Sequence, residues 1–296
     1  MLVIKDLYKS YRKTKVLTDI NLDIEENKIY GLLGRNGVGK TTLLNLISSQ
    51  TLRNGGEIKL DGKEIFENSE AMEDICLVKE FQTSIVEKKV RDILALAGIV
   101  YKDWDEEYKN YLVKEFNLNT KKKLLKLSKG NQTIVGLIIG LASRSRLTMF
   151  DEPTLGLDAA ARYKFYNLLL EDYEKKPRTI IISTHLIDEV ANLFEEVIIL
   201  NDEKVVLKDN VNSLIEKSYF LSGREDLISP IIKDKRVIHR EEFGATKIVG
   251  IHDNLTPQEI TYIKDNNIEI SNIPLQKLFI YLTENLAKGE YSNGFN

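Results

Sequence analysis

Short apolar runs, separated by longer mixed stretches, organise this chain. Three runs, at residues 29–33, 147–150 and 179–182, are almost continuously apolar. Runs of this length are typical of strands that are buried on both faces of a parallel sheet. Each is followed directly by glycine or by reactive polar residues. Because parallel strands present their carboxyl ends at one edge of a sheet, we expect these groups to converge on one site.

The remaining pattern divides the chain further. Alternating apolar and polar positions over residues 2–8 and 16–24 predict antiparallel strands, and turn residues around 57–60 predict another short strand pair. Residues 86–126 have a polar, helical pattern, which indicates a helical insertion. A further helix is predicted over 133–143.

We therefore predict an α/β protein with a parallel-sheet core, an N-terminal antiparallel β subdomain and a helical subdomain at about 84–145. These parts form one domain over residues 1–215. Motifs are absent beyond about residue 215, where short strand-like runs mix with helical stretches. We expect a small accessory α+β domain over residues 216–296.

Composition narrows the classes of protein to consider. A chain of 296 residues, 43% hydrophobic and 29% charged, suits a globular domain with an appendage. Its net charge of −3 provides no basic field for nucleic acid. The single cysteine, Cys76, lies in an apolar run and is expected to be a buried hydrophobic residue in a reducing compartment. The longest apolar run, 134–142, is much shorter than the roughly 20 residues of a membrane span.

The first of the three apolar runs leads into a glycine-rich loop. Residues 34–41 match the pattern G-x-x-x-x-G-K-[ST] in full. The glycines allow the backbone to point N–H groups at phosphates, and the helix that follows adds its positive dipole end. Lys40 is expected to reach the β- and γ-phosphates and the Thr41 hydroxyl to bind Mg²⁺. The loop therefore predicts a nucleoside triphosphate site.

Two acids follow the second run. Asp151 suits the Mg²⁺ shell, and Glu152 is the expected general base for an attacking water. Consecutive residues at a strand end point in different directions, so one can face the metal and the other the γ-phosphate. A solvated loop pair is the alternative. The preceding apolar residues and the following Pro153 argue against it.

The segment Leu127-Ser128-Lys129-Gly130-Asn131 precedes the helix predicted over 133–143. Ser128 is a plausible helix N-cap, and the same helix start is a possible anion site. The ordered motifs at 34–41, 127–131, 151–152, 155–158 and His185 resemble those of ABC transporter ATPase subunits. The resemblance covers about residues 1–215.

The resemblance implies specific roles for these residues. Tyr11 stacks on adenine, and Asp158 lies in a loop that crosses a dimer. Ser128 and Gly130 act on the nucleotide held by the other subunit. Lys40, Glu152 and His185, which contacts the γ-phosphate, are the expected catalytic residues, and Asp151 supports the metal. The triphosphate and Mg²⁺ of bound ATP are held by Asn36, Gly37, Gly39, Lys40, Thr41 and Thr42.

The sequence departs from the family pattern at two places. The usual signature is Leu-Ser-Gly-Gly-Gln, and Lys129 and Asn131 replace a glycine and the glutamine. A signature with lysine at position 129 resembles that of bacterial exporters of antibiotics, lantibiotics and other peptides, such as phenol-soluble modulins. In the family, the loop that joins the core to the helical insertion usually carries a glutamine, the coupling residue. Alignment places Glu80 at that position, with Gln82 two residues later. A glutamate there is also a potential ligand of Mg²⁺-bound water, and either residue is a candidate for the coupling role.

The resemblance implies two kinds of partner: a second ATPase subunit, identical or different, and separate integral membrane permease subunits. The expected location is cytoplasmic, at the inner face of the membrane through these permeases, without nucleic acid. One alternative is a soluble ABC ATPase acting on nucleic acid or ribosomes. The interval between Lys40 and Ser128 lacks the long coiled coil of such proteins. A second alternative is a small-molecule kinase. The signature segment argues against it, because such kinases do not carry that segment.

Overall fold

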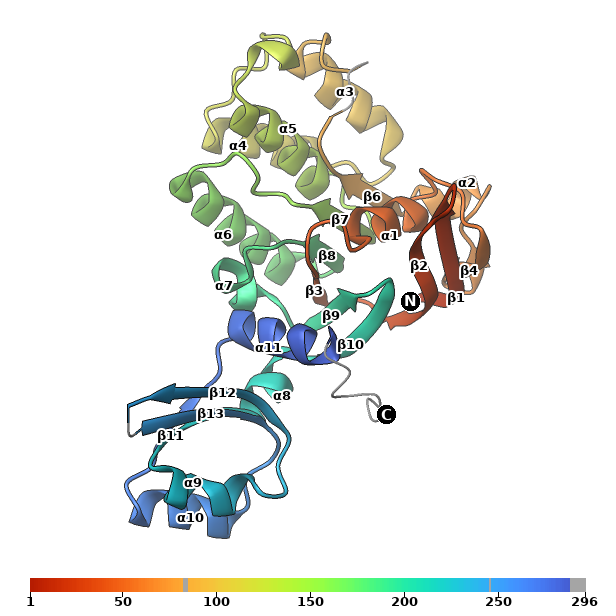
Figure 1. The fold of residues 1–296 in the computed structure, drawn as a ribbon. Coiled ribbons are helices and arrows are strands. Elements are labelled where there is room, and N and C mark those ends of the chain that lie inside the picture. The colour runs from red at the N-terminus through yellow and green to blue at the C-terminus, as the bar shows by residue number, and fades with distance from the viewer. Residues whose placement is uncertain (82–84, 245, 288–296) are drawn as a thin grey trace. The chain divides into compact units, whose positions relative to one another are not determined.

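The computed structural model describes residues 1–81, 85–244 and 246–287 (Figure 1). The chain divides into two compact units. The first consists of Met1–His185 and Ile198–Val206, and the second of Leu186–Val197 and the described residues from Leu207 onward. Each unit has its own hydrophobic core, so the two are described separately.

A six-stranded sheet has the strand order β10-β9-β3-β8-β7-β6. Within the first unit, β3, β8, β7 and β6 pair in parallel. Every residue of β3 and β8 is buried, as their continuous apolar runs predict. The predicted α/β fold with a parallel-sheet core is confirmed. The strands are β3 (Ile29–Leu33), β6 (Ile75–Val78), β7 (Leu147–Asp151), β8 (Thr179–Ser183), β9 (Glu196–Asn201) and β10 (Lys204–Asn210).

The predicted N-terminal antiparallel subdomain is also present. Its strands are β1 (Leu2–Tyr11), β2 (Thr14–Ile24), β4 (Gly55–Leu60) and β5 (Lys63–Glu64), in the order β2-β1-β4-β5. Register shifts interrupt the β1–β2 pairing, which is why strict alternation marks only part of each strand. Helix α1 (Lys40–Ile47) shares a buried cluster with these strands. The sheet thus supports the helix that follows the glycine-rich loop.

Helices form the insertion between β6 and β7, as predicted. They are α3 (Val90–Val100), α4 (Glu106–Glu115) and α5 (Lys129–Ala142), with the short α2 (Ser69–Met72) before β6 and a 3₁₀ turn at Leu124–Lys126. Helix α5 begins at Lys129, four residues before the predicted start. The cause is Ser128, whose hydroxyl accepts a hydrogen bond from the Asn131 N–H at 3.3 Å. Cys76 is fully buried in β6, as expected, and burial raises the pKa of its thiol.

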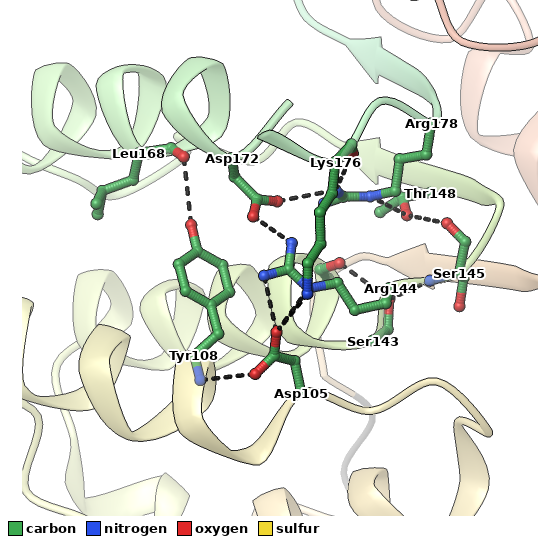
Figure 2. A network of polar contacts seen from close by, with 11 residues as sticks. Asp105, Tyr108, Ser143, Arg144, Ser145, Thr148, Leu168, Asp172, Lys176 and Arg178 are labelled. Atoms are coloured by element: carbon green, nitrogen blue, oxygen red, sulfur yellow. Dashed lines mark hydrogen bonds and ion pairs between the residues drawn. The ribbon is translucent and has the colours of Figure 1, made fainter. Parts of the chain in front are cut away.

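A buried polar network joins the helical insertion to the rest of this unit (Figure 2). Asp172 of α6 (Ala159–Lys175) is 4% exposed and lies between the guanidinium groups of Arg144 and Arg178. The Arg178 Nη1–Asp172 Oδ2 distance is 2.8 Å. Arg144 also donates to Asp105, the N-cap of α4, at 3.0 Å, and lies 4.3 Å from the centre of the Tyr108 ring. The network therefore connects the C-terminal end of α5 to both α4 and α6.

The second unit contains a complete βαββαβ arrangement. Its elements are β11 (Ser218–Gly223), α9 (Glu225–Ile232), β12 (Val237–Phe243), β13 (Thr246–His252), α10 (Pro257–Asp265) and β14 (Glu269–Asn272). The sheet is antiparallel in the order β12-β13-β11-β14, which is the ferredoxin-like topology. Helices α9 and α10 lie on the same face of the sheet (Figure 1). The α+β mixture expected here thus has a defined topology.

The elements α7 (Ile187–Val190), α8 (Val211–Glu216) and α11 (Leu275–Ala287), with a 3₁₀ turn at Ala191–Leu193, complete this unit. Tyr281 of α11 stacks on His239 with ring centres 4.1 Å apart, so this helix contacts the sheet at β12. His252 Nδ1 lies 2.8 Å from the Ser218 hydroxyl, and burial lowers its pKa. Both histidines are packing residues in this unit.

Replacing Asp172 with asparagine tests the buried network. We expect the variant to lose about 3 kcal/mol of unfolding free energy, because it removes the charge that two buried guanidinium groups share. Urea titration followed by circular dichroism measures this loss. Glu171→Gln, on the exposed side of the same helix, is the matched control. A loss below about 1 kcal/mol would show that the network contributes no more than an exposed ion pair.

Candidate nucleotide-binding site

The glycine-rich loop connects β3 to α1 in a conformation that requires glycine. Gly37 and Gly39 have φ angles of 82° and 114°, in the left-handed region. A Cβ atom on Gly39 would also lie 2.9 Å from Leu17 Cδ2 and 3.1 Å from the Val16 carbonyl oxygen. The loop is therefore held against β2, and α1 begins directly after it. This is the backbone arrangement that binds phosphate at a helix N-terminus.

Lys40 is buried beside this loop. Its side chain is 6% exposed, and its Nζ atom donates a hydrogen bond to the Gly34 carbonyl oxygen at 2.7 Å. The same Nζ lies 3.8 Å from Glu152 Oε1, which belongs to the segment after β7. Burial lowers the pKa of the Lys40 ammonium, while the carboxylates of Glu152 and Asp151 oppose that shift. The loop thus presents a positive charge close to the end of β7.

Asp151 connects the ends of two parallel strands and the start of α1. Its carboxylate accepts hydrogen bonds from the Thr41 hydroxyl at 2.7 Å and from the Ser183 hydroxyl at the end of β8. Asp151 and Ser183 are neighbours in the β7–β8 register. Ser183 was not among the predicted site residues. Its position at the end of the third apolar run was the available signal.

The Asp151 region suits a magnesium ion. Mg²⁺ prefers oxygen ligands, keeps several waters and typically uses one or two protein groups together with substrate phosphates. The Thr41 hydroxyl and the Asp151 carboxylate are such oxygen ligands, and they already lie together. Among the described residues, no group of three or more His, Cys, Asp and Glu side chains is arranged to hold a metal. The site therefore fits an ion that arrives with a phosphate ligand.

Glu152 lies between the His185 imidazole and the Lys40 ammonium group. Its carboxylate is 2.8 Å from His185 Nδ1 and 3.8 Å from Lys40 Nζ. Its φ angle of 49° is unusual for a residue with a side chain, and its N–H donates to the Ser183 carbonyl oxygen at 3.0 Å. This backbone geometry turns Glu152 away from the direction of β7. All three predicted strand ends thus contribute to one site.

Two of the other predicted residues, Ser128 and Asp158, cap helices in the first unit. The Asp158 carboxylate accepts a hydrogen bond from the Ala161 N–H at 2.8 Å at the start of α6. Gly130 lies against the loop that precedes Asp158, since a Cβ on Gly130 would be 2.7 Å from the Gly156 carbonyl oxygen. The signature segment and the Asp158 loop therefore pack together within one chain.

Glu80 forms an ion pair with Lys129, so the two departures from the family pattern contact each other. Both line a cleft of about 490 Å³ that Asp151 and Glu152 also line. No described contact brings Glu80 to the Thr41–Asp151 pair. Gln82 lies outside the described residues. The choice between Glu80 and Gln82 as coupling residue stays open.

Tyr11, Asn36 and Thr42 are the remaining predicted residues. Tyr11 is 46% exposed at the end of β1, in the hairpin whose second strand contacts Gly39, and Lys9 Nζ lies 4.5 Å from its ring centre. Asn36 is exposed at the loop tip, and Thr42 is half-buried in α1.

In the described part of the chain, no helix is both long and apolar enough to cross a membrane.

Comparison with known proteins agrees with this geometry. The family described as ABC transporter matches residues 17–155. The ABC transporter ATP-binding protein YtrB of Bacillus subtilis (strain 168) is 30% identical over 220 residues, 73% of this chain and 74% of that protein. The taurine import ATP-binding protein TauB of Escherichia coli O157:H7 is 30% identical over 79% of this chain and 98% of that protein. The lantibiotic transport ATP-binding protein SrtF of Streptococcus pyogenes is 26% identical over 70% of this chain and 90% of that protein.

Solved structures of ATP-binding cassettes share the fold of a large part of this chain. The dimeric structure of the ATP-binding cassette MJ0796 bound to ADP and Pi has a TM-score of 0.62 and 24% identity, and the match covers 71% of this chain and 99% of that one. The structure of another ABC transporter ATP-binding subunit has a TM-score of 0.65 and 24% identity over 72% of this chain and 91% of that one. These similarities show the cassette fold.

The motifs, the geometry at the strand ends and the relatives all indicate the same family of ATPases. Lys40, Asp151, Glu152 and His185 are brought together by β3, β7 and β8. This chain is 30% identical to one relative and covers 74% of that relative's length. Proteins of the family identified in this way bind ATP with Mg²⁺ and hydrolyse it. The chain belongs to the ATP-binding ATPase subunits of ABC transporters.

Proposed function

We propose that this ATPase subunit drives export of peptides, toxins or antibiotics through separate permease subunits in the membrane. The support for export is the similarity to a lantibiotic transport ATP-binding protein and the lysine in the signature segment. The relatives also include a taurine import protein, so the direction of transport needs its own test. The nucleic-acid alternative has no comparable support, since the net charge is −3.

The observation that carries the catalytic part is the position of Glu152 beside His185 and Lys40. In this proposal Lys40 binds the phosphates, and Glu152 accepts a proton from the attacking water. His185 orients the Glu152 carboxylate and contacts the γ-phosphate. Thr41 and Asp151 hold Mg²⁺, which neutralises phosphate charge when bound. Each of these side chains projects from the carboxyl end of a parallel strand, or from the loop or helix start that follows one.

We infer that the nucleotide is bound between two copies, or between this chain and a second ATPase subunit. Ser128 and Lys129 are exposed at the N-terminus of α5, a 14-residue helix whose positive dipole end lies there. No described contact joins this helix start to the glycine-rich loop of the same chain. A second subunit would bring such a helix start to the γ-phosphate. ATP then closes the dimer, and hydrolysis reopens it.

The same proposal assigns the parts of the chain. Residues 1–215 would be the ATPase domain, and residues 216–296 the accessory domain. The ferredoxin-like module at β11–β14 supports a separate role for the latter. The ATPase would lie at the cytoplasmic face, bound to its permease near the helical insertion.

The variant Glu152→Gln tests the general base. We expect ATP binding to persist while phosphate release falls by about 10²- to 10⁴-fold, because the amide does not accept the proton. Bound ATP then accumulates, and light scattering at saturating ATP should detect a dimer. Glu174→Gln, exposed on α6, is the control for charge loss. A monomeric Glu152→Gln protein would show that the two-copy site is wrong or needs the permease.

Lys40→Ala tests the phosphate loop. We expect ATP affinity to fall by more than about 100-fold, because the variant loses a buried charge-assisted contact to phosphate. Calorimetric titration with MgATP measures the change, and Lys121→Ala at an exposed position is the control. Undiminished binding would remove Lys40 from the site.

Export is tested with the complete complex. The permease that co-purifies with this chain is expressed with it, and inside-out membrane vesicles are prepared. We expect ATP-dependent accumulation of a fluorescent lantibiotic in these vesicles, and no accumulation with the Glu152→Gln subunit. Uptake of taurine by right-side-out vesicles, without peptide export, would instead establish an importer.

A further inference from the structure

Two segments of the chain depart from the usual family pattern, and the departures have opposite charge. In the segment of residues 79–81 that follows β6, here called the coupling segment, Glu80 aligns with a glutamine of the usual pattern. In the signature segment, Lys129 aligns with a glycine. They are 49 residues apart in sequence, yet Lys129 Nζ forms an ion pair with Glu80 Oε1. The two substitutions therefore meet in space.

The pair lies in the cleft that contains the catalytic acids. Glu80, Asp151 and Glu152 are three carboxylates that line this space of about 490 Å³. Apolar side chains of Val78, Phe81, Pro153 and Leu155 form much of the remaining wall. Solvent partly screens the charges of Glu80 and Lys129, since both side chains are largely exposed. A third carboxylate here opposes the binding of a polyphosphate anion.

The other two carboxylates have partners of their own. Asp151 accepts hydrogen bonds from two hydroxyl groups, and Glu152 lies beside His185 and Lys40. Lys79 also lines this cleft, but its Nζ donates to Asn45 Oδ1 at 2.6 Å and forms no described ion pair with Glu80. The cation that the structure places against Glu80 is therefore Lys129.

The backbone that carries Lys129 is firmly positioned. Lys129 is the first residue of α5, directly after the cap formed by Ser128. Close packing of Gly130 against Gly156, and a hydrogen bond of 2.9 Å from the Thr133 hydroxyl to the Leu155 carbonyl oxygen, hold this helix start on the loop after β7. An ion pair from such a position holds the coupling segment as well as neutralising it.

We propose that Lys129 is a positioning residue for the ATPase reaction, which neutralises Glu80 in the cleft and holds the coupling segment beside the signature helix. The proposal rests on the proposed function only in taking this cleft as the nucleotide site. It predicts that Lys129 matters because Glu80 is charged. Glycine at position 129 is then compatible with glutamine at position 80, the combination usual in the family.

A double-mutant cycle in the full chain tests this dependence. Steady-state hydrolysis gives KM and kcat for MgATP, and calorimetry gives Kd, for Lys129→Gln, Glu80→Gln and the double variant. Both side chains are more than two-thirds exposed, which limits the effect. We expect Lys129→Gln to raise KM and Kd by about two- to fivefold. The value of kcat should change less than KM, because uncompensated charge opposes ground-state and transition-state binding alike.

Rescue is the deciding result. The double variants Glu80→Gln with Lys129→Gln, and Glu80→Gln with Lys129→Gly, should return KM to within about 1.5-fold of the original value. Lys129→Arg should retain the original KM, and the effect of Lys129→Gln should shrink at high salt. Lys121→Gln is the control for loss of an exposed lysine.

Two outcomes would overturn the proposal. An unchanged KM and Kd in Lys129→Gln would show that the pair has no role in nucleotide binding. A double variant as impaired as Lys129→Gln would show that Lys129 acts directly on phosphate or elsewhere, and not through Glu80. The cycle needs neither permease nor cargo, so a negative vesicle assay would contradict the export proposal while leaving this result intact.

Discussion

The parallel pairing of β3, β8 and β7 is the constraint on which the site depends. Hydrogen-bond register places Ser183 beside Leu32 on one side and beside Asp151 on the other. The polar groups that follow these strands must therefore emerge at one edge of the sheet. Because β3 and β8 are buried along their whole length, a shift of register along the sheet would draw the polar groups that follow them into the core. Burial of the strands thus fixes the distances among the catalytic groups.

Charge balance is the second requirement of this edge. Lys40 is buried, and it is compatible with burial because loop carbonyl oxygens and nearby carboxylates surround it. Glu152 and Asp151 in turn receive contacts from His185, Thr41 and Ser183. Farther from the site, Asp172 holds two guanidinium groups and thereby fixes α5 relative to α4 and α6 (Figure 2). The helix that begins at the signature segment is anchored at both of its ends.

Individual site residues were predictable where the chemistry follows a strand directly. Asp151 and Glu152, and the loop from Gly34 onward, each follow a buried strand, so local pattern and motif suffice. The bond from Ser183 to Asp151 joins residues 32 apart, and the pairing of Glu80 with Lys129 joins residues 49 apart. Local sequence patterns do not indicate which distant residues will be in contact. The interplay of the two departures from the family pattern was therefore invisible before the fold was known.

The sequence by itself determined which segments are buried, where the phosphate loop lies and which acids accompany it, because burial periodicity and loop chemistry are local properties. The tertiary structure alone decided how strands pair. In the second unit, β11 lies between β13 and β14, which follow it in sequence at a distance. Strand order depends on non-local hydrogen bonds and on the packing of Leu221, Val249 and Ile263 in one core. That dependence is why an α+β mixture was predictable and its βαββαβ topology was not.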